Sequence, residues 1–137
     1  MSQANVEIVR RAYEAFNGDD PETAIALFDP EVEWTLPEHF PDAETWGGRE
    51  RVVEGLAALS EAWESIHIDV KELIDAGERV VALVHIQGRA ALTGLDLGGM
   101  GVDAHVWTLR EGRVVTVRMY GGTEEALRAI GRPRPLA

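Results

Sequence analysis

The chain has 137 residues, of which 45% are hydrophobic and 27% are charged, and its formal net charge is −11. These values are typical of one soluble globular domain, which we expect to span residues 1–137. The acidic balance disfavours nucleic acid and anionic membranes as partners, because both are bound through basic patches. There is no cysteine, which excludes disulfides, thiolate metal sites and cysteine nucleophiles.

The sequence also predicts the cellular location of the protein. No apolar run approaches the roughly 18 residues that a membrane-spanning helix needs. The first residues, MSQANVEIVRR, lack the apolar core of a signal peptide. We therefore expect a cytoplasmic protein with no membrane partner.

Helical spacing dominates the first half of the chain. Apolar residues three or four apart predict a first helix over residues 6–16, ended by Asn17–Gly18. Asp20 and Pro21 are typical of the N-cap and first position of a second helix. A short strand over residues 32–36 and a loop over residues 37–48 follow. A third helix is expected from Arg49, with an apolar stripe that runs to Trp63.

The second half of the chain alternates as strands do. Residues 66–71 and 78–91 predict two strands joined by a turn at 75–77, and a glycine-rich loop over 93–101 leads to a hairpin over 102–120. A short helix over residues 125–130, ended by Gly131, closes the pattern. Helices followed by long antiparallel strands indicate an α+β fold.

The hairpin has two unlike faces if Arg110 pairs with Arg113 across the turn Glu111–Gly112. Side chains alternate along a strand, so one face is apolar and carries Val102, Ala104, Val106, Thr108, Val115, Val117 and Met119. The other face carries Asp103, His105, Trp107, Arg118 and Tyr120. Since helices cover the apolar face of a sheet, we expect the apolar set to point into the fold.

The order of elements, the segment WGGRERVVEGL and the ending HVWTLREGRVVTVRMYGGTEEAL resemble the SnoaL-like branch of the nuclear transport factor 2-like superfamily. The resemblance covers nearly the whole chain. It implies a cone, in which a strongly curved, mainly antiparallel sheet wraps around three N-terminal helices and a short C-terminal helix follows. Relatives such as ketosteroid isomerase, limonene epoxide hydrolase and polyketide cyclases use such a cone as a pocket, and the superfamily often dimerises through the outer sheet face.

The catalytic groups of those relatives fall on residues that cannot replace them. The tyrosine of ketosteroid isomerase falls at Ala12, one residue from Tyr13, and its two aspartates fall at Leu36 and Ala104. The aspartate of limonene epoxide hydrolase falls at Met119. Because the relatives' acids point inward, the resemblance places the apolar hairpin face inside.

Two sets of residues follow from this orientation. The predicted pocket lining is Phe16, Trp34, Leu36, Trp46, Ala104, Val106, Val117 and Met119. The predicted outer face, through which we expect a homodimer, carries His85, Gln87, His105, Trp107, Arg118 and Tyr120. Pairing of His105 with Arg118, beside Asp103 and Tyr120, is interpreted as interface structure rather than as an acid–base cluster.

The sequence leaves two functions open. The first is a pocket that binds a small hydrophobic molecule and isomerises, cyclises or dehydrates it, with Tyr13 or His39 as the catalytic proton-transfer group. The alternative is a non-catalytic ligand-binding or accessory dimer of the same fold. No cofactor and no metal is expected, since the sequence has neither a dinucleotide or phosphate-binding motif nor metal-ligand spacing.

Overall fold

The computed structural model describes residues 3–18, 20–36, 45–90, 104–121 and 123–131. Its elements in chain order are α1 (Gln3–Asn17), α2 (Pro21–Ala26), β1 (Phe28–Thr35), β2 (Thr45–Gly47), α3 (Arg49–Ala62), β3 (Trp63–Ala76), β4 (Arg79–Ala90), β5 (Ala104–Arg110), β6 (Arg113–Tyr120) and α4 (Thr123–Ala129). The fold is α+β, as predicted. No helix in these ranges is both long and apolar enough to cross a membrane.

Local chemistry sets the ends of the helices. The Asp20 side chain accepts the backbone N–H of Thr23 at 3.3 Å, and Pro21 stands at the start of α2. The carbonyl of Gly48, which has φ +90°, accepts the N–H of Val52 at the start of α3. Gly131, at φ 71°, follows α4 in the left-handed conformation that glycine adopts most readily.

The strands form one sheet in the order β2-β1-β6-β5-β4-β3. Neighbouring strands are antiparallel except β1 and β6, which are parallel. Several bounds differ from the sequence prediction, and β1 begins at Phe28 rather than at residue 32. β2, at residues 45–47, lies where a loop was expected, and Trp63 begins β3 instead of ending α3. Trp63 continues the helical spacing of the apolar residues in α3, so the sequence pattern did not show that the backbone becomes extended at this residue.

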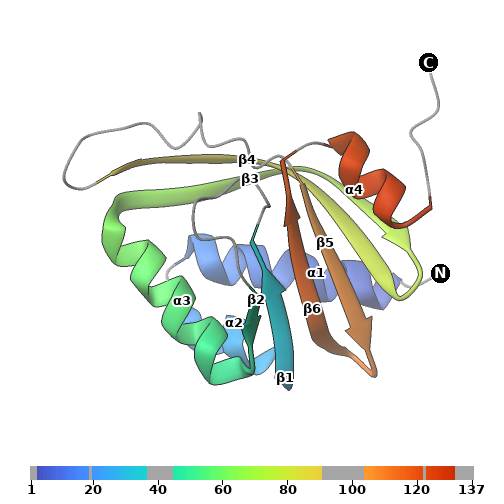
Figure 1. Cartoon of the computed structure of the whole chain (residues 1–137), viewed down its shortest axis with the longest axis horizontal. Helices are drawn as coiled ribbons and strands as arrows, with labels where there is room; N and C mark the ends of the chain where they lie inside the picture. The colour runs from blue at the N-terminus through green and yellow to red at the C-terminus, as the bar shows by residue number, and fades with distance from the viewer. Residues whose placement is uncertain (1–2, 19, 37–44, 91–103, 122, 132–137) are drawn as a thin grey trace.

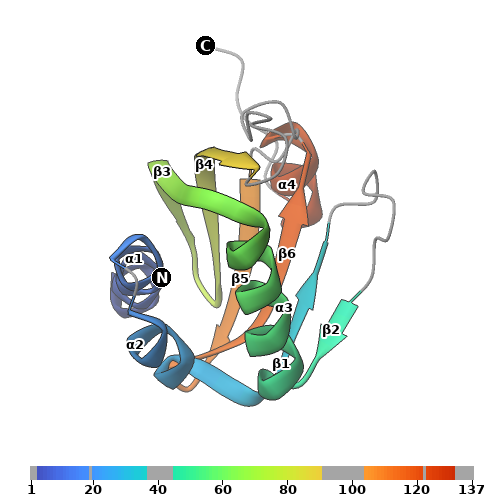
Figure 2. The same ribbon diagram turned by 90° about the vertical axis from the view of Figure 1, so that its left-hand side faces the viewer.

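The curved sheet is covered on both faces. Figures 1 and 2 show α1, α2 and α3 on the concave side and α4 on the opposite side. We call the buried cluster on the concave side the inner core; it includes Val9, Tyr13, Val32, Trp34, Trp46, Val52, Val80, Ala82, Trp107, Val117 and Met119. The cluster under α4 is the outer core, formed by Val81, Leu83, Ala104, Val106, Ala126 and Leu127.

Candidate functional site

A one-residue irregularity in the terminal hairpin decides which side chains enter the cone. The predicted turn is confirmed: Arg110 pairs with Arg113, and Glu111 and Gly112 both have positive φ. Beyond the turn, Leu109 pairs with Val114 but Thr108 pairs with Thr116. Val115 is therefore an extra residue on β6, a β-bulge.

From Thr108 to Ala104, each residue of β5 pairs with a residue of β6 that lies one position later than predicted. His105 lies opposite Met119 and Trp107 lies opposite Val117, where the sequence prediction had placed Arg118 and Thr116. A one-residue shift exchanges the two faces of a strand. Val117 and Met119 are indeed inside, but they share that face with His105 and Trp107.

The predicted orientation of β5 is therefore wrong. Ala104 and Val106, expected to line the pocket, pack in the outer core against α4. His105 and Trp107, expected on the outer face, are 1% and 2% exposed and lie on the concave side. The prediction assumed that only one face of this strand would be covered by helices, whereas α4 covers the other.

Tyr13 reaches the strand from α1 and joins the two inward side chains. The Trp107 indole N–H donates to the Tyr13 hydroxyl oxygen at 2.8 Å, and the same oxygen lies 2.6 Å from Nδ1 of His105. The Tyr13 and His105 rings are stacked at 14°, while Trp107 meets Tyr13 edge-on. We call Tyr13, His105 and Trp107 the buried triad.

Burial controls the charge state of the triad. Removal from water lowers the pKa of His105 from 6.5 to about 4, so the imidazole is neutral at neutral pH. Burial also raises the pKa of Tyr13 far above its ordinary value, and the hydrogen bond from Trp107 opposes this only in part. The triad is thus uncharged at neutral pH.

One polar atom of the triad is left without a partner. Nε2 of His105 is buried and makes no hydrogen bond within the part of the chain that the structure describes. Trp34 lies edge-on to the imidazole with ring centroids 6.5 Å apart, and its own indole N–H donates to Met119 Sδ at 3.2 Å. An unpaired buried imidazole nitrogen costs about 1–3 kcal/mol, so it calls for a functional explanation.

The other predicted pocket residues are mostly on the concave side. Trp34 and Trp46 are buried in the inner core, and Phe16 and Leu36 are half-buried against it. His39, the second candidate for proton transfer, lies outside the described residues. Of the candidate catalytic pair, the structure therefore locates only Tyr13, whose hydroxyl contacts Trp107 and His105.

Of the remaining residues of the predicted dimer face, His85, Arg118 and Tyr120 lie on the outer side of the sheet. His85 on β4 and Arg118 on β6 are exposed, and the Arg118 guanidinium lies 5.5 Å above the ring of half-buried Tyr120. Gln87 pairs with His67 through the backbone of β3, and its side chain is outside the described set. These residues do not form the stripe with His105 and Trp107 that the sequence suggested.

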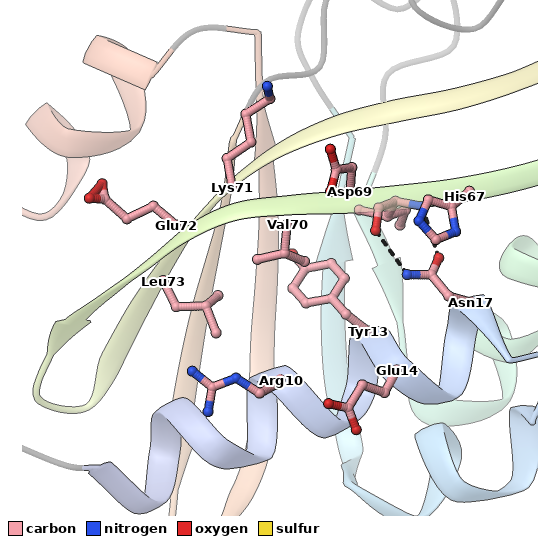
Figure 3. Close-up of a pocket in the computed structure, with 11 residues that line it drawn as sticks. Arg10, Tyr13, Glu14, Asn17, His67, Asp69, Val70, Lys71, Glu72 and Leu73 are labelled. Carbon is pink, nitrogen blue, oxygen red and sulfur yellow. Dashed lines mark hydrogen bonds between the residues drawn. The ribbon is translucent and has the colours of Figure 1, made fainter.

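A groove of about 380 Å³ lies between α1 and β3, and Tyr13 of the buried triad is one of its lining residues. Figure 3 shows Arg10, Glu14 and Asn17 along the helix and the segment from His67 to Leu73 above them. The Asn17 amide bonds both backbone groups of Ile68, each at 2.8 Å. This groove has mixed charge and was not anticipated from the sequence. Within the described ranges, no three acidic or histidine side chains are grouped to hold a metal ion.

Comparisons with known proteins agree with this architecture. Residues 9–117 match the family model described as a SnoaL-like domain, whereas curated proteins gave no match. An NTF2-like protein of unknown function from Burkholderia pseudomallei is similar at 29% identity and TM-score 0.76, with 96% of this chain and 99% of that chain covered.

Two further solved structures contain small molecules. TerC, co-crystallised with polyporic acid, shares 25% identity at TM-score 0.74, covering 93% of this chain and 98% of that one. A protein from Catenulispora acidiphila with a ketosteroid isomerase-like fold, in complex with trimethylamine, shares 21% identity at TM-score 0.72, covering 93% and 94%. The second likeness concerns the fold alone.

Proposed function

Since the chain belongs to the SnoaL-like domain family, we propose that it binds a small hydrophobic molecule against the concave face of its sheet, with the buried triad as the polar end of the site. The observation that carries this proposal is the unpaired Nε2 of His105. The imidazole lies against the rings of Tyr13 and Trp34, and the few polar groups of small-molecule sites usually lie among such apolar side chains. Small molecules bound by proteins of similar fold support small-molecule binding in this fold.

The triad is better suited to polarise a bound molecule than to exchange protons with it. A Tyr13 phenolate would be buried and is disfavoured, and a protonated His105 is disfavoured for the same reason. Among the described residues, no aspartate or glutamate is buried, so no buried carboxylate accompanies His105 as a base. In an isomerase, cyclase or dehydratase, His105 would act as a hydrogen-bond donor and the base would be His39.

A blocking substitution tests the binding site. Met119→Trp places a large ring opposite His105 and should abolish binding of naphthalene-sized neutral molecules. Ligand-observed NMR measures this binding. Arg110→Trp adds the same ring at the exposed hairpin tip and should leave binding unchanged. Circular dichroism must show both variants folded. Unchanged binding by a folded Met119→Trp protein would reject the concave site.

We further propose that the protein is a homodimer through the exposed part of its outer sheet face, around His85, Arg118 and Tyr120. Arginine and aromatic residues are enriched at such contacts. Arg118→Glu should yield monomers in sedimentation velocity, while the control Arg110→Glu, at the exposed hairpin tip, should not. A monomeric native protein would contradict the proposal.

A further inference from the structure

The hydrogen bonds of the buried triad run in one direction, because only some of its groups can donate and others must accept. An indole nitrogen only donates, so Trp107 must give its N–H to the Tyr13 oxygen. A phenol has one proton to donate, and the described contacts of the Tyr13 oxygen are Trp107 and His105. The Tyr13 proton therefore points at Nδ1 of His105, which must accept it.

This direction fixes the tautomer of His105. A neutral imidazole carries one proton, and when Nδ1 accepts a hydrogen bond the proton resides on Nε2. The opposite tautomer would place the Nδ1 proton against the Tyr13 oxygen. The Tyr13 hydroxyl proton would then have no acceptor among the described residues, at the cost of an unpaired buried donor. The chain of bonds from Trp107 through Tyr13 to His105 thus ends in a free N–H.

We propose that Trp107 and Tyr13 are positioning residues that hold His105 as a fixed Nε2–H donor, so that the site selects neutral hydrophobic molecules bearing a carbonyl oxygen. This inference rests on the proposed binding site and adds the class of ligand that it takes. A carbonyl oxygen supplies the acceptor that Nε2–H lacks. An ammonium group would meet another donor in a region where burial already disfavours positive charge.

The tautomer is measured directly by two-bond ¹H–¹⁵N correlation spectra of the histidine rings. The chain has four histidines, and loss of one ring system in His105→Gln assigns the signals. The native protein at pH 7 should show a protonated Nε2 and an unprotonated Nδ1 for His105. In Tyr13→Phe, the Nδ1 signal should move and the tautomers should mix.

Trp34→Phe is the matched control for this spectrum. Its indole bonds Met119 rather than the triad, although its ring also lies against His105. The tautomer should therefore persist in this variant. A protonated Nδ1 in the native protein, or an unchanged His105 spectrum in folded Tyr13→Phe, would overturn the inference whatever the protein binds. Trp107→Phe gives a second variant should Tyr13→Phe not fold.

Three probes of the same size then test the ligand class by isothermal titration: 1-indanone, indane and 2-aminoindane. One added hydrogen bond to a buried donor should make indanone bind about tenfold more tightly than indane. The ammonium probe should bind most weakly, and Tyr13→Phe should reduce the preference for indanone. Equal affinities, or tightest binding of 2-aminoindane, would overturn the selectivity alone. No binding by any of the three would instead reject the binding site itself.

Discussion

At the scale of single residues, the buried imidazole of His105 links stability to pH. Its pKa is about 4 in the folded chain and 6.5 when exposed, so the unfolded chain binds the extra proton between these values. Stability therefore rises with pH across this window. The contribution of His105 is fully present above about pH 6.5 and is lost as the pH falls toward 4.

The size of this pH dependence follows from the shift in the pKa of His105. Unfolding free energy of the native protein, relative to His105→Gln, should fall by up to about 3 kcal/mol between pH 7 and pH 4. Urea denaturation of both proteins at several pH values measures this difference, and other titrating groups cancel in the comparison. Parallel pH profiles would show that the imidazole is not sequestered from water in the folded protein.

Gly55 is a second residue whose identity is dictated by packing. A β-carbon there would lie 2.5 Å from two ring atoms of Trp46, which β2 holds against α3. Gly55→Ala gains helix propensity of up to about 1 kcal/mol but forces the ring to move, a cost of about 1–3 kcal/mol. We expect net destabilisation in urea titration. Gly47→Ala, where a β-carbon meets nothing, should be neutral, and Trp46→Leu should remove the penalty at Gly55.

At the scale of elements, one side-chain amide holds the part of β3 around Ile68 against α1. β3 is an edge strand with a neighbouring strand on one side only. The two hydrogen bonds from Asn17 satisfy the N–H and C=O of Ile68 on its open side. Asn17→Ala should cost about 1–3 kcal/mol. The Ile68 amide should also exchange with deuterium faster, ahead of its neighbours in β3.

The control for this prediction lies one turn earlier on α1. Glu14 is exposed beside the same groove, so Glu14→Ala should leave both stability and Ile68 exchange nearly unchanged. If Ile68 exchange is equally slow in Asn17→Ala, the amide bond does not protect this edge. Equal losses in the two variants would show that the effect comes from the helix rather than from the strand contact.

The elements themselves were largely predictable from sequence, because their signals are local. The helix cap at Asp20, the turn at Glu111–Gly112 and the stop at Gly131 each act within a few residues. The family resemblance supplied the curved sheet. The end of α3 and the short strand β2 were missed, since their backbone is set by contacts with distant segments.

The candidate site was not predictable in the same way, because the alternation of apolar and polar residues does not reveal the bulge at Val115. Val114 and Val115 are both apolar, and either fits an inward position. A second signal was present: the C-terminal helix needs an apolar sheet face, and Ala104 with Val106 supplies it. That requirement alone directs His105 into the cone, toward Tyr13.

At the scale of the whole molecule, the charge excess opposes the compact state. The chain carries a net charge of −11, and the ion pairs of Arg10 with Glu7 and of Arg128 with Glu124 are exposed and stabilise little. Because the chain has 24 acidic and 13 basic residues, pairing of every basic residue would still leave repulsion among the excess carboxylates. This repulsion is long-ranged at low ionic strength, where the Debye length reaches about 30 Å, and short-ranged at about 8 Å in physiological salt.

Salt should therefore stabilise this protein. Raising sodium chloride from about 10 mM to about 150 mM should increase the unfolding free energy by about 1 kcal/mol, because screening weakens the repulsion. Urea is the suitable denaturant, since guanidinium is itself a salt. Replacing exposed Glu31 and Glu54 by lysine removes part of the negative excess and should flatten the salt dependence. An equally steep dependence in that variant would assign the stabilisation to ion binding or to general salting-out, rather than to the charge spread over the whole surface.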